Sequence, residues 1–245
     1  MTLVGIVSQA RMGSTRLPGK VMMVAKGKTM LAHHLTRLRY ATMPLFVATT
    51  TNDSDDQIVD EAARVADGVF RGPERDVLGR YVEAARAFDL DVIVRVTSDC
   101  PLIDAQLVRA GVEEYLRLND DNVYVSNVVT RTYPRGFDFE VFSRSALEDA
   151  HENARDEFDR EHVTPYLNRN VSGRMRLRDV IRSSDASRYR LTLDTRDDLL
   201  LLRRIVEHHD AALMNAEELI GLLESRPDLV EINANVSQTP LPNEH

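Results

Sequence analysis

The chain lacks the features that several large protein classes need. It contains one cysteine, Cys100, so no intrachain disulfide can form and a reducing cytoplasmic setting is expected. It has 31 Lys and Arg against 39 Asp and Glu, and this acidic balance disfavours a general nucleic-acid-binding protein. No apolar run approaches the length of a membrane span, and the first residues do not resemble a signal peptide. We therefore expect a cytoplasmic protein that binds neither nucleic acid nor membranes.

Several catalytic signatures are missing as well. Five residues separate Gly13 from Gly19, and Val21 follows Lys20, whereas a Walker A loop has four residues between its glycines and Ser or Thr after its lysine. The loop is not a G-x-G-x-x-G segment either, and the chain has no G-x-S-x-G motif and no grouping of Cys with His. These absences disfavour a P-loop ATPase, a dinucleotide-dependent oxidoreductase, an α/β-hydrolase and a zinc enzyme.

Strand-like and helix-like segments alternate through the first half of the chain. The patterns predict strands at 3–8, 45–49, 69–70, 91–97 and 122–126, and helices at 29–40, around 54–65, at 77–88 and at 105–118. Such alternation is typical of an α/β protein with a mostly parallel twisted sheet and helices on both faces. Ligands in such sheets bind at the carboxyl ends of the strands.

The second half is less regular. We expect strands at 137–142, 174–181 and 189–193, with antiparallel pairing as an option for the last two, and helices at 143–154, 157–168, 197–208 and 216–223. The polar segment 233–245 is predicted to be a flexible tail. Because no linker or repeat divides the chain, we expect residues 1–245 to form a single domain.

A cationic loop follows the first strand. Arg11, Arg16 and Lys20 lie within a few residues of Gly13 and Ser14. Glycine lets backbone N–H groups approach a ligand and the cations neutralise charge, so this composition suits a polyphosphate. The alternative is an ordinary solvated basic loop.

Two aspartates follow strand-like segments. Asp99 ends the run at 91–97 and Asp194 follows 189–193. Both would lie near the cationic loop if their strands end at the same sheet edge, where they could hold one Mg²⁺ that carries a nucleotide's phosphates. The alternatives are a turn residue for Asp99 and a helix N-cap for Asp194.

Two further clusters, at 133–140 and 159–166, concentrate charge beside turn residues. They are candidates for binding an anionic second substrate, and the alternative is ordinary surface.

Five segments, in this order over about residues 3–205, resemble the spore coat polysaccharide type (SpsF-like) cytidylyltransferases, relatives of the CMP-KDO and CMP-sialic acid synthetases. The segments are A-R-M-G-S-T-R-L-P-G-K, R-G-P-E-R-D-V-L-G-R-Y, D-C-P-L-I-D, R-E-H-V-T-P-Y and L-D-T-R-D-D-L. The chain departs from the family pattern at Ser98, where glycine commonly precedes the aspartate. The resemblance implies a Rossmann-like, GT-A-like nucleotidyltransferase fold, a three-layer sandwich with a small β-rich subregion at about 130–180 for acceptor binding and dimerisation. It also implies a homodimer.

The resemblance further implies a reaction and a set of residues. CMP would pass from CTP to an acidic acceptor, an acidic sugar or a phosphonate, with release of pyrophosphate and with Mg²⁺ as cofactor. The nucleotide would be bound by Ala10, Arg11, Gly13, Ser14, Arg16 and Lys20 at its phosphates, and by Arg71 and Asp76 near its base. The metal would be held by Asp99 and Asp194, and the acceptor by Glu140, Arg160 and His162. The catalytic roles would fall to Lys20, Arg11 and Asp99.

Two other functions stay open from sequence. A nucleotide-sugar-dependent glycosyltransferase uses related sheets, but the D-x-D at Asp89 to Asp91 precedes its strand, and Lys20 suits a triphosphate better than a sugar diphosphate. A non-catalytic nucleotide-binding module is disfavoured by the apparent metal pair.

Overall fold

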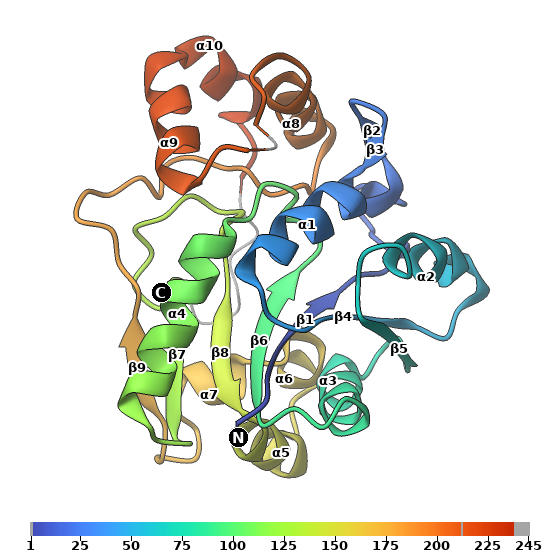
Figure 1. The fold of residues 1–245 in the computed structure, drawn as a ribbon, viewed down its shortest axis with the longest axis vertical. Coiled ribbons are helices and arrows are strands. Elements are labelled where there is room, and N and C mark those ends of the chain that lie inside the picture. Colours follow the sequence, from blue (N-terminus) through green and yellow to red (C-terminus); the bar gives the residue numbers. More distant parts are fainter. Residues whose placement is uncertain (1, 212, 238–245) are drawn as a thin grey trace.

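A seven-stranded sheet runs through the computed structural model, which describes residues 2–211 and 213–237 (Figure 1). In sheet order the strands are β5 (Gly68–Gly72), β4 (Leu45–Thr50), β1 (Val4–Gln9), β6 (Val92–Thr97), β8 (Glu140–Ser143), β7 (Val123–Ser126) and β9 (Arg176–Asp179). Neighbouring strands pair in parallel except at β8, which is antiparallel to both β6 and β7. The prediction of a mostly parallel α/β sheet is therefore confirmed.

Helices cover both faces of this sheet (Figure 1). One face carries α1 (Met30–Leu38), α2 (Asp56–Ala62), α4 (Ala105–Leu118), α8 (Arg196–His208), α9 (Ala216–Ser225) and α10 (Pro227–Val230). The other carries α3 (Val77–Ala87), α5 (Arg144–Asn153), α6 (Glu157–His162) and α7 (Pro165–Asn168). Short elements complete the chain: the hairpin β2 (Val24–Ala25) and β3 (Lys28–Thr29), and the 3-10 turns η1 (Lys20–Met22), η2 (Arg39–Ala41), η3 (Asp53–Asp55) and η4 (Glu231–Asn233).

Two hydrophobic clusters separate the three layers. The central strands contribute to both, because successive side chains point to opposite faces: Ile6 and Val94 lie in one cluster, and Val7 and Ile93 in the other. All four side chains are fully buried, and each stabilises the fold by about 1.5–3 kcal/mol through removal of apolar surface from water. The central strands β1 and β6 therefore hold their carboxyl ends at a fixed position.

The structure differs from the predicted elements in the second half. Residues 189–193 form no regular strand, and only Arg190 makes an isolated bridge, with Arg135. The helix predicted at 157–168 is split into α6 and α7, because Val163 takes a positive φ of 73° and Pro165 has no N–H to continue the helix.

The region at about 130–180 holds more helix than strand and is not β-rich. Its named strands, β8 and β9, belong to the main sheet, and α5 to α7 connect them. The predicted tail also begins too early: Asn233 is buried, and its side chain donates to Asp198 Oδ1 at 2.8 Å and to the Arg190 carbonyl at 3.1 Å. The rest of that prediction, from residue 238 on, lies outside the described residues. None of the helices in 2–211 and 213–237 has the length and apolar character needed to cross a membrane.

Candidate active site

Most of the predicted site residues gather at a cavity beside the carboxyl ends of β1 and β6. Its volume is ≈ 260 Å³, and it is lined by Gln9, Ala10, Arg11, Ser14, Thr15, Arg16, Lys20, Val21, Val77, Arg80, Thr97, Ser98, Asp99, Glu161, His162 and Asp194. A larger cavity of ≈ 540 Å³ lies between α1, α4 and the segment before α9, and none of the predicted site residues lines it. The smaller cavity is therefore the candidate active site.

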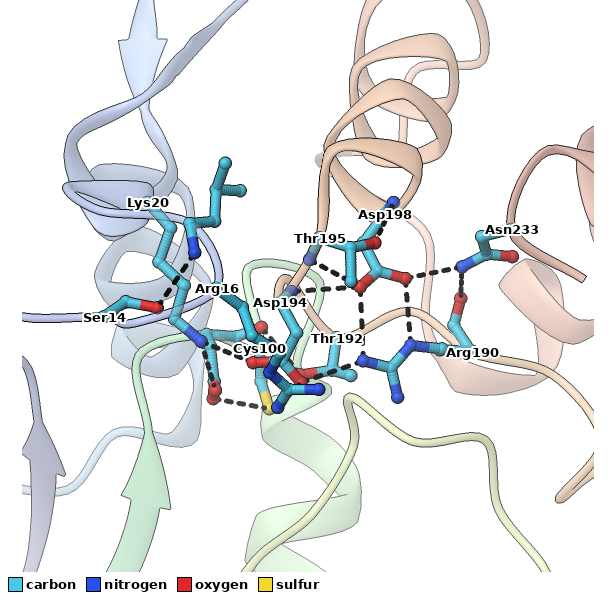
Figure 2. A network of polar contacts seen from close by, with 12 residues as sticks. Ser14, Arg16, Lys20, Cys100, Arg190, Thr192, Asp194, Thr195, Asp198 and Asn233 are labelled. Carbon is cyan, nitrogen blue, oxygen red and sulfur yellow. Dashed lines mark hydrogen bonds and ion pairs between the residues drawn. The ribbon is translucent and has the colours of Figure 1, made fainter. Parts of the chain in front are cut away.

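Lys20 joins Asp99 and Asp194, and Figure 2 shows its contact with Asp194. Its Nζ donates to Asp99 Oδ2 at 2.9 Å and to Asp194 Oδ1 at 2.7 Å. Burial by itself would lower the pKa of Lys20, but the attraction of the two carboxylates outweighs it and raises this pKa. Burial likewise opposes ionisation of Asp99, yet Lys20 and a hydrogen bond from Thr97 hold the pKa of Asp99 at about 2. The lysine and Asp99 are thus both charged at neutral pH.

Backbone contacts bring the two aspartates together although they are far apart in sequence. The Leu193 N–H donates to the Asp99 carbonyl at 2.7 Å, and the Thr192 hydroxyl donates to the same oxygen at 3.2 Å. These bonds fix the segment before α8 against the end of β6. Asp194 therefore faces the same cavity as Asp99 without a regular strand to carry it.

A network behind Asp194 holds it in place (Figure 2). Arg190 Nη2 donates to Asp194 Oδ2 at 2.8 Å, and Arg190 Nε donates to Asp198 Oδ1 at 2.9 Å. Asp198 also accepts from the backbone N–H groups of Asp194 and Thr195, and from Asn233. Sequence reasoning missed Arg190, Asp198 and Asn233. The capping box of Thr195 with Asp198 was the available signal for one of them.

The other residues of the cationic loop also border the cavity. Arg16 Nη2 lies 3.3 Å from Asp194 Oδ2, and the half-exposed Arg11 lies 3.7 Å from Glu161 Oε1. The Met12 N–H donates to Asp55 Oδ1 at 2.9 Å, and this buried carboxylate anchors the loop to the end of β4.

Gly13 and Gly19 give the loop its tight shape. A Cβ on Gly13 would lie 3.0 Å from Glu74 Oε1, and Gly19 has a positive φ of 69° that L-residues rarely adopt. Gly13 does not line the cavity, whereas Ser14 does, and the Ser14 hydroxyl accepts from the Leu17 N–H at 3.4 Å. Ala10 lines the cavity at the end of β1.

Arg71, Asp76 and Arg160, like Gly13, lie outside the cavity lining. Arg71 donates to the carbonyls of Thr50 and Asn52 and pairs with Asp56. Asp76 caps α3 by accepting from the Gly79 N–H and pairs with Arg160 at 2.6 Å. A role of Arg71 and Asp76 near the base, or of Arg160 at the acceptor, stays a prediction.

Glu140 and His162 were both predicted to bind the acceptor, and the structure separates them. Glu140 is buried outside the cavity lining, where it pairs with Arg95 and accepts from the Tyr124 hydroxyl at 2.6 Å and the Thr164 hydroxyl at 2.5 Å. His162 lines the cavity. Burial lowers its pKa, Glu161 opposes this, and nearby arginines add to it, so the imidazole is neutral at neutral pH.

Comparison with known proteins gives the family. A sequence profile of the cytidylyltransferases matches residues 4–222. The chain belongs to the cytidylyltransferase family. It is 35% identical to an uncharacterized protein of Methanocaldococcus jannaschii over 241 residues, and this alignment covers 97% of each chain. It is 31% identical to the spore coat polysaccharide biosynthesis protein SpsF of Bacillus subtilis over 231 residues, and this alignment covers 91% of this chain and 94% of the relative.

Solved structures agree with this assignment. A cytidylyltransferase from Leptospira borgpetersenii superposes with a TM-score of 0.90 at 33% identity, over 98% of this chain and 100% of that one. A CMP:2-keto-3-deoxy-manno-octonic acid synthetase, solved in complex with CTP, superposes with a TM-score of 0.62 at 19% identity, over 84% of this chain and 98% of that one. The second likeness confirms the fold of this cytidylyltransferase as that of a nucleotidyltransferase.

The carboxylate pair of the cytidylyltransferase fits a hard divalent cation. Asp99 and Asp194 both direct an oxygen at the same positive charge, the Lys20 ammonium, so both can reach one cation. Within 2–211 and 213–237, no group of three or more His, Cys, Asp or Glu side chains gathers for a metal. Mg²⁺ often takes only one or two protein carboxylates and completes its shell with phosphates and water. A pair is therefore sufficient if the substrate supplies the other ligands.

Proposed function

We propose that this cytidylyltransferase transfers CMP from CTP to a small acidic acceptor, an acidic sugar or a phosphonate, and releases pyrophosphate. The observation that carries the proposal is the convergence of Asp99 and Asp194 on Lys20, in a cavity that Arg11 and Arg16 also line. The neighbour solved with CTP, although it shares the fold alone, adds support for the nucleotide.

The cations suit the charge that develops in this reaction. An acceptor oxygen attacks the α-phosphorus while the bond to the bridging oxygen of pyrophosphate breaks, so negative charge grows on the leaving group. Arg11, Arg16 and Lys20 all line one cavity, and together they would stabilise that charge. Lys20 would exchange part of its contact with the carboxylates for contact with phosphate oxygens.

Asp99 and Asp194 would hold Mg²⁺. When bound, the ion neutralises phosphate charge and orients the triphosphate. The supporting chain, from Arg190 and Asp198 to Asn233, keeps Asp194 oriented toward the cavity.

The acceptor would bind on the α6 side of the cavity, beside His162. A carboxylate or phosphonate oxygen is already ionised at neutral pH and needs no strong base, whereas a sugar hydroxyl must lose a proton. The lowered pKa of His162 leaves its imidazole neutral, so it can accept that proton or donate a hydrogen bond to an anionic group. The acceptor-binding roles of Arg160 and Glu140 stay predictions.

We also propose a homodimer that forms through the region at about 130–180. The edge strand β9 and the residues after it expose large apolar side chains, with Leu177 at 40% and Ile181 at 59%. An exposed edge strand of this kind pairs readily with another chain. Light scattering should give a mass of two chains, and a mass of one chain would contradict the proposal. A cytoplasmic location, expected from the single cysteine, stays a prediction.

The activity can be tested directly. Calorimetry with Mg²⁺ present should detect CTP binding, and a panel of acidic sugars and phosphonates should include at least one that gives pyrophosphate release. Asp89→Asn is a suitable control variant, because Asp89 is exposed and precedes β6 at the opposite edge of the sheet. Absence of CTP binding, or transfer from a nucleotide sugar without pyrophosphate release, would contradict the proposed function.

A further inference from the structure

Arg80 is a buried cation that has no carboxylate partner within residues 2–211 and 213–237. It lies on α3, its side chain is 1% exposed, and it lines the candidate active site. Its Nη1 donates to the Pro73 carbonyl at 2.7 Å, while its Nε is fully buried and has no hydrogen-bond partner. Among the described residues Arg80 forms no ion pair. Because the side chain lines the cavity and Nε is sealed, the remaining Nη protons are the donors that a ligand can reach.

A buried charge without an ion-pair partner lowers the stability of the fold, so the presence of Arg80 needs an explanation. Removing a guanidinium from water without a carboxylate or a full set of acceptors destabilises a fold. Burial lowers the pKa of Arg80 and the positive charge of Arg11 adds to that effect, while Tyr81, Asp55 and Glu74 oppose it without reversing it. A guanidinium nevertheless stays protonated. A ligand that supplies acceptors to Arg80 would relieve this destabilisation.

The packing around Arg80 fixes its position. A Cβ on Gly72 would lie 3.1 Å from Arg80 Cγ, so the glycine lets the β5 end pack closely against the arginine stem. The next residue, Tyr81, donates to the carbonyls of Val7 and Val96 at 3.2 Å each, which anchors α3 across β1 and β6. The guanidinium is thus preorganised, and little entropy is lost when a ligand binds it.

The surroundings of Arg80 differ from those of the loop cations. Arg11 and Arg16 have side chains that are 38% and 42% exposed, which suits hydrated phosphates. Arg80 is desolvated and shares its helix face with the apolar Val77, one turn earlier. A flat neutral ring with hydrogen-bond acceptors on one edge matches an apolar wall beside a buried donor.

We propose that Arg80 determines base specificity by donating hydrogen bonds to the O2 and N3 edge of the cytosine ring. Cytosine presents two neighbouring acceptors on this edge, whereas uracil presents an N3–H donor beside its O2. A guanidinium that faces this edge therefore binds cytosine more tightly, and its donors repel the N3–H of uracil. The inference rests on the proposed function, because it assumes that a pyrimidine nucleotide occupies this cavity.

Binding of three probes separates a contact to the base from a contact to phosphate. Calorimetry in Mg²⁺ with CTP, UTP and inorganic tripolyphosphate should be compared between wild type and Arg80→Met, which keeps the stem but removes the donors. We expect CTP affinity to fall about 10- to 100-fold, the preference for CTP over UTP to narrow about 10-fold, and tripolyphosphate affinity to stay within about twofold. An equal loss for all three probes would assign Arg80 to the phosphates and overturn the inference, and so would no loss for CTP.

Two further variants keep the test decisive. Arg86→Met removes an exposed arginine of the same helix, which pairs with Glu83 and Glu148 outside the cavity, and should change no affinity. Arg80→Lys retains the charge without the fork, so it should bind tripolyphosphate normally and still discriminate poorly between CTP and UTP. If Arg80→Met fails to fold, Arg80→Lys carries the same comparison, and wild-type discrimination in that variant would overturn the inference. If wild type itself does not bind CTP, the proposed function fails and not Arg80 alone.

Discussion

Two clusters of this protein each pair a nearly buried cation with carboxylates, but they differ in whether a ligand can reach the carboxylates. Lys20 bridges Asp99 and Asp194, and Arg95 pairs with Glu140, and in both clusters the cation is only 12–13% exposed. The first cluster lines a cavity, so a ligand can reach its oxygens. The oxygens of Glu140 are occupied by protein partners. We therefore call the cluster of Lys20, Asp99 and Asp194 the open cluster, and the cluster of Arg95 and Glu140 the sealed cluster. The difference teaches that a buried carboxylate is available for chemistry only when a ligand can replace its partner.

The origin of the partners explains this difference. Arg95 and Glu140 face each other directly in the register of β6 and β8, and Tyr124 on β7 and Thr164 before α7 close the same group. Sheet register leaves these side chains no freedom. Lys20 instead follows Gly19, in a loop attached to the sheet mainly at its ends. We therefore expect mutations in the first cluster to affect chiefly the reaction, and mutations in the second to affect stability while leaving the reaction rate almost unchanged.

The strongest test of the first half of the comparison is Asp99→Asn. Loss of this carboxylate removes one proposed metal ligand and one partner of Lys20, so kcat/KM should fall about 10³-fold in a pyrophosphate-release assay. The free energy of unfolding, measured in urea at neutral pH, should fall by no more than about 2 kcal/mol, because the lowered pKa of Asp99 reports a stabilised carboxylate while Lys20 keeps its contact with Asp194. A normal rate in a folded variant would show that Asp99 is only a turn residue.

Lys20→Met should have the next largest effect on the reaction. The transition state should lose on the order of 3 kcal/mol of stabilisation, which is about 10²-fold in kcat/KM. Mn²⁺ binding to the nucleotide-free protein should become tighter, because the ammonium no longer competes for Asp99 and Asp194. Weaker Mn²⁺ binding in this variant would mean that Lys20 orients the carboxylates rather than competing for them.

Glu140→Gln tests the second half of the comparison. The substitution leaves Arg95 buried without a carboxylate, so the free energy of unfolding should fall by about 2–3 kcal/mol in urea titrations. The folded variant should keep kcat/KM within about threefold of wild type, because Glu140 does not line the cavity. A large loss of rate with unchanged stability would restore the sequence-based prediction that Glu140 binds the acceptor, and the comparison would fail.

The sequence predicted the open cluster better than the sealed one, and the reason is geometric. Carboxyl ends of parallel strands meet at one sheet edge, so Asp99 could be placed beside the loop of Lys20 without knowledge of any distant contact. The burial of Glu140 depends on which face of β8 it occupies, and on contacts with Tyr124 and Thr164, which come from separate segments. A local sequence pattern does not predict contacts between residues that are far apart in the chain.

The support of Asp194 shows the same limit. Its position depends on Arg190 and Asn233, and a polar segment near the chain end gave no sign that Asn233 would be buried against them. Residues 189–193 were predicted to be a strand because hydrophobic and polar residues alternate there, yet hydrogen bonds to Asp99 hold them as an irregular segment. The five-segment resemblance predicted the family correctly, because ordered motifs over most of the chain are more specific than any one contact.

The smallest effect concerns the buried histidine that supports the open cluster. His34 on α1 has Nδ1 2.8 Å from the Cys100 carbonyl, so Nδ1 donates, and Nε2 accepts from the Ser8 hydroxyl at 2.9 Å. Burial lowers the pKa of His34 from its ordinary 6.5 to about 4, although the Cys100 carbonyl and Asp99 oppose this shift. As the pH falls below 6.5, the unfolded chain takes up a proton at this position while the native state does not. Stability is therefore complete above 6.5 and is lost as the pH falls toward 4.

We expect His34 to account for a loss of about 1 kcal/mol in the free energy of unfolding between about pH 7 and pH 5.5. His34→Gln, whose amide can donate to Cys100 and accept from Ser8, should lack this part of the pH dependence in parallel urea titrations. His33 and His162 also have lowered pKa values and are present in both proteins, so the difference between the two titrations isolates His34. Identical pH profiles would mean that water reaches His34 in the native state, and that the edge bearing Asp99 is less rigid than the sealed cluster around Glu140.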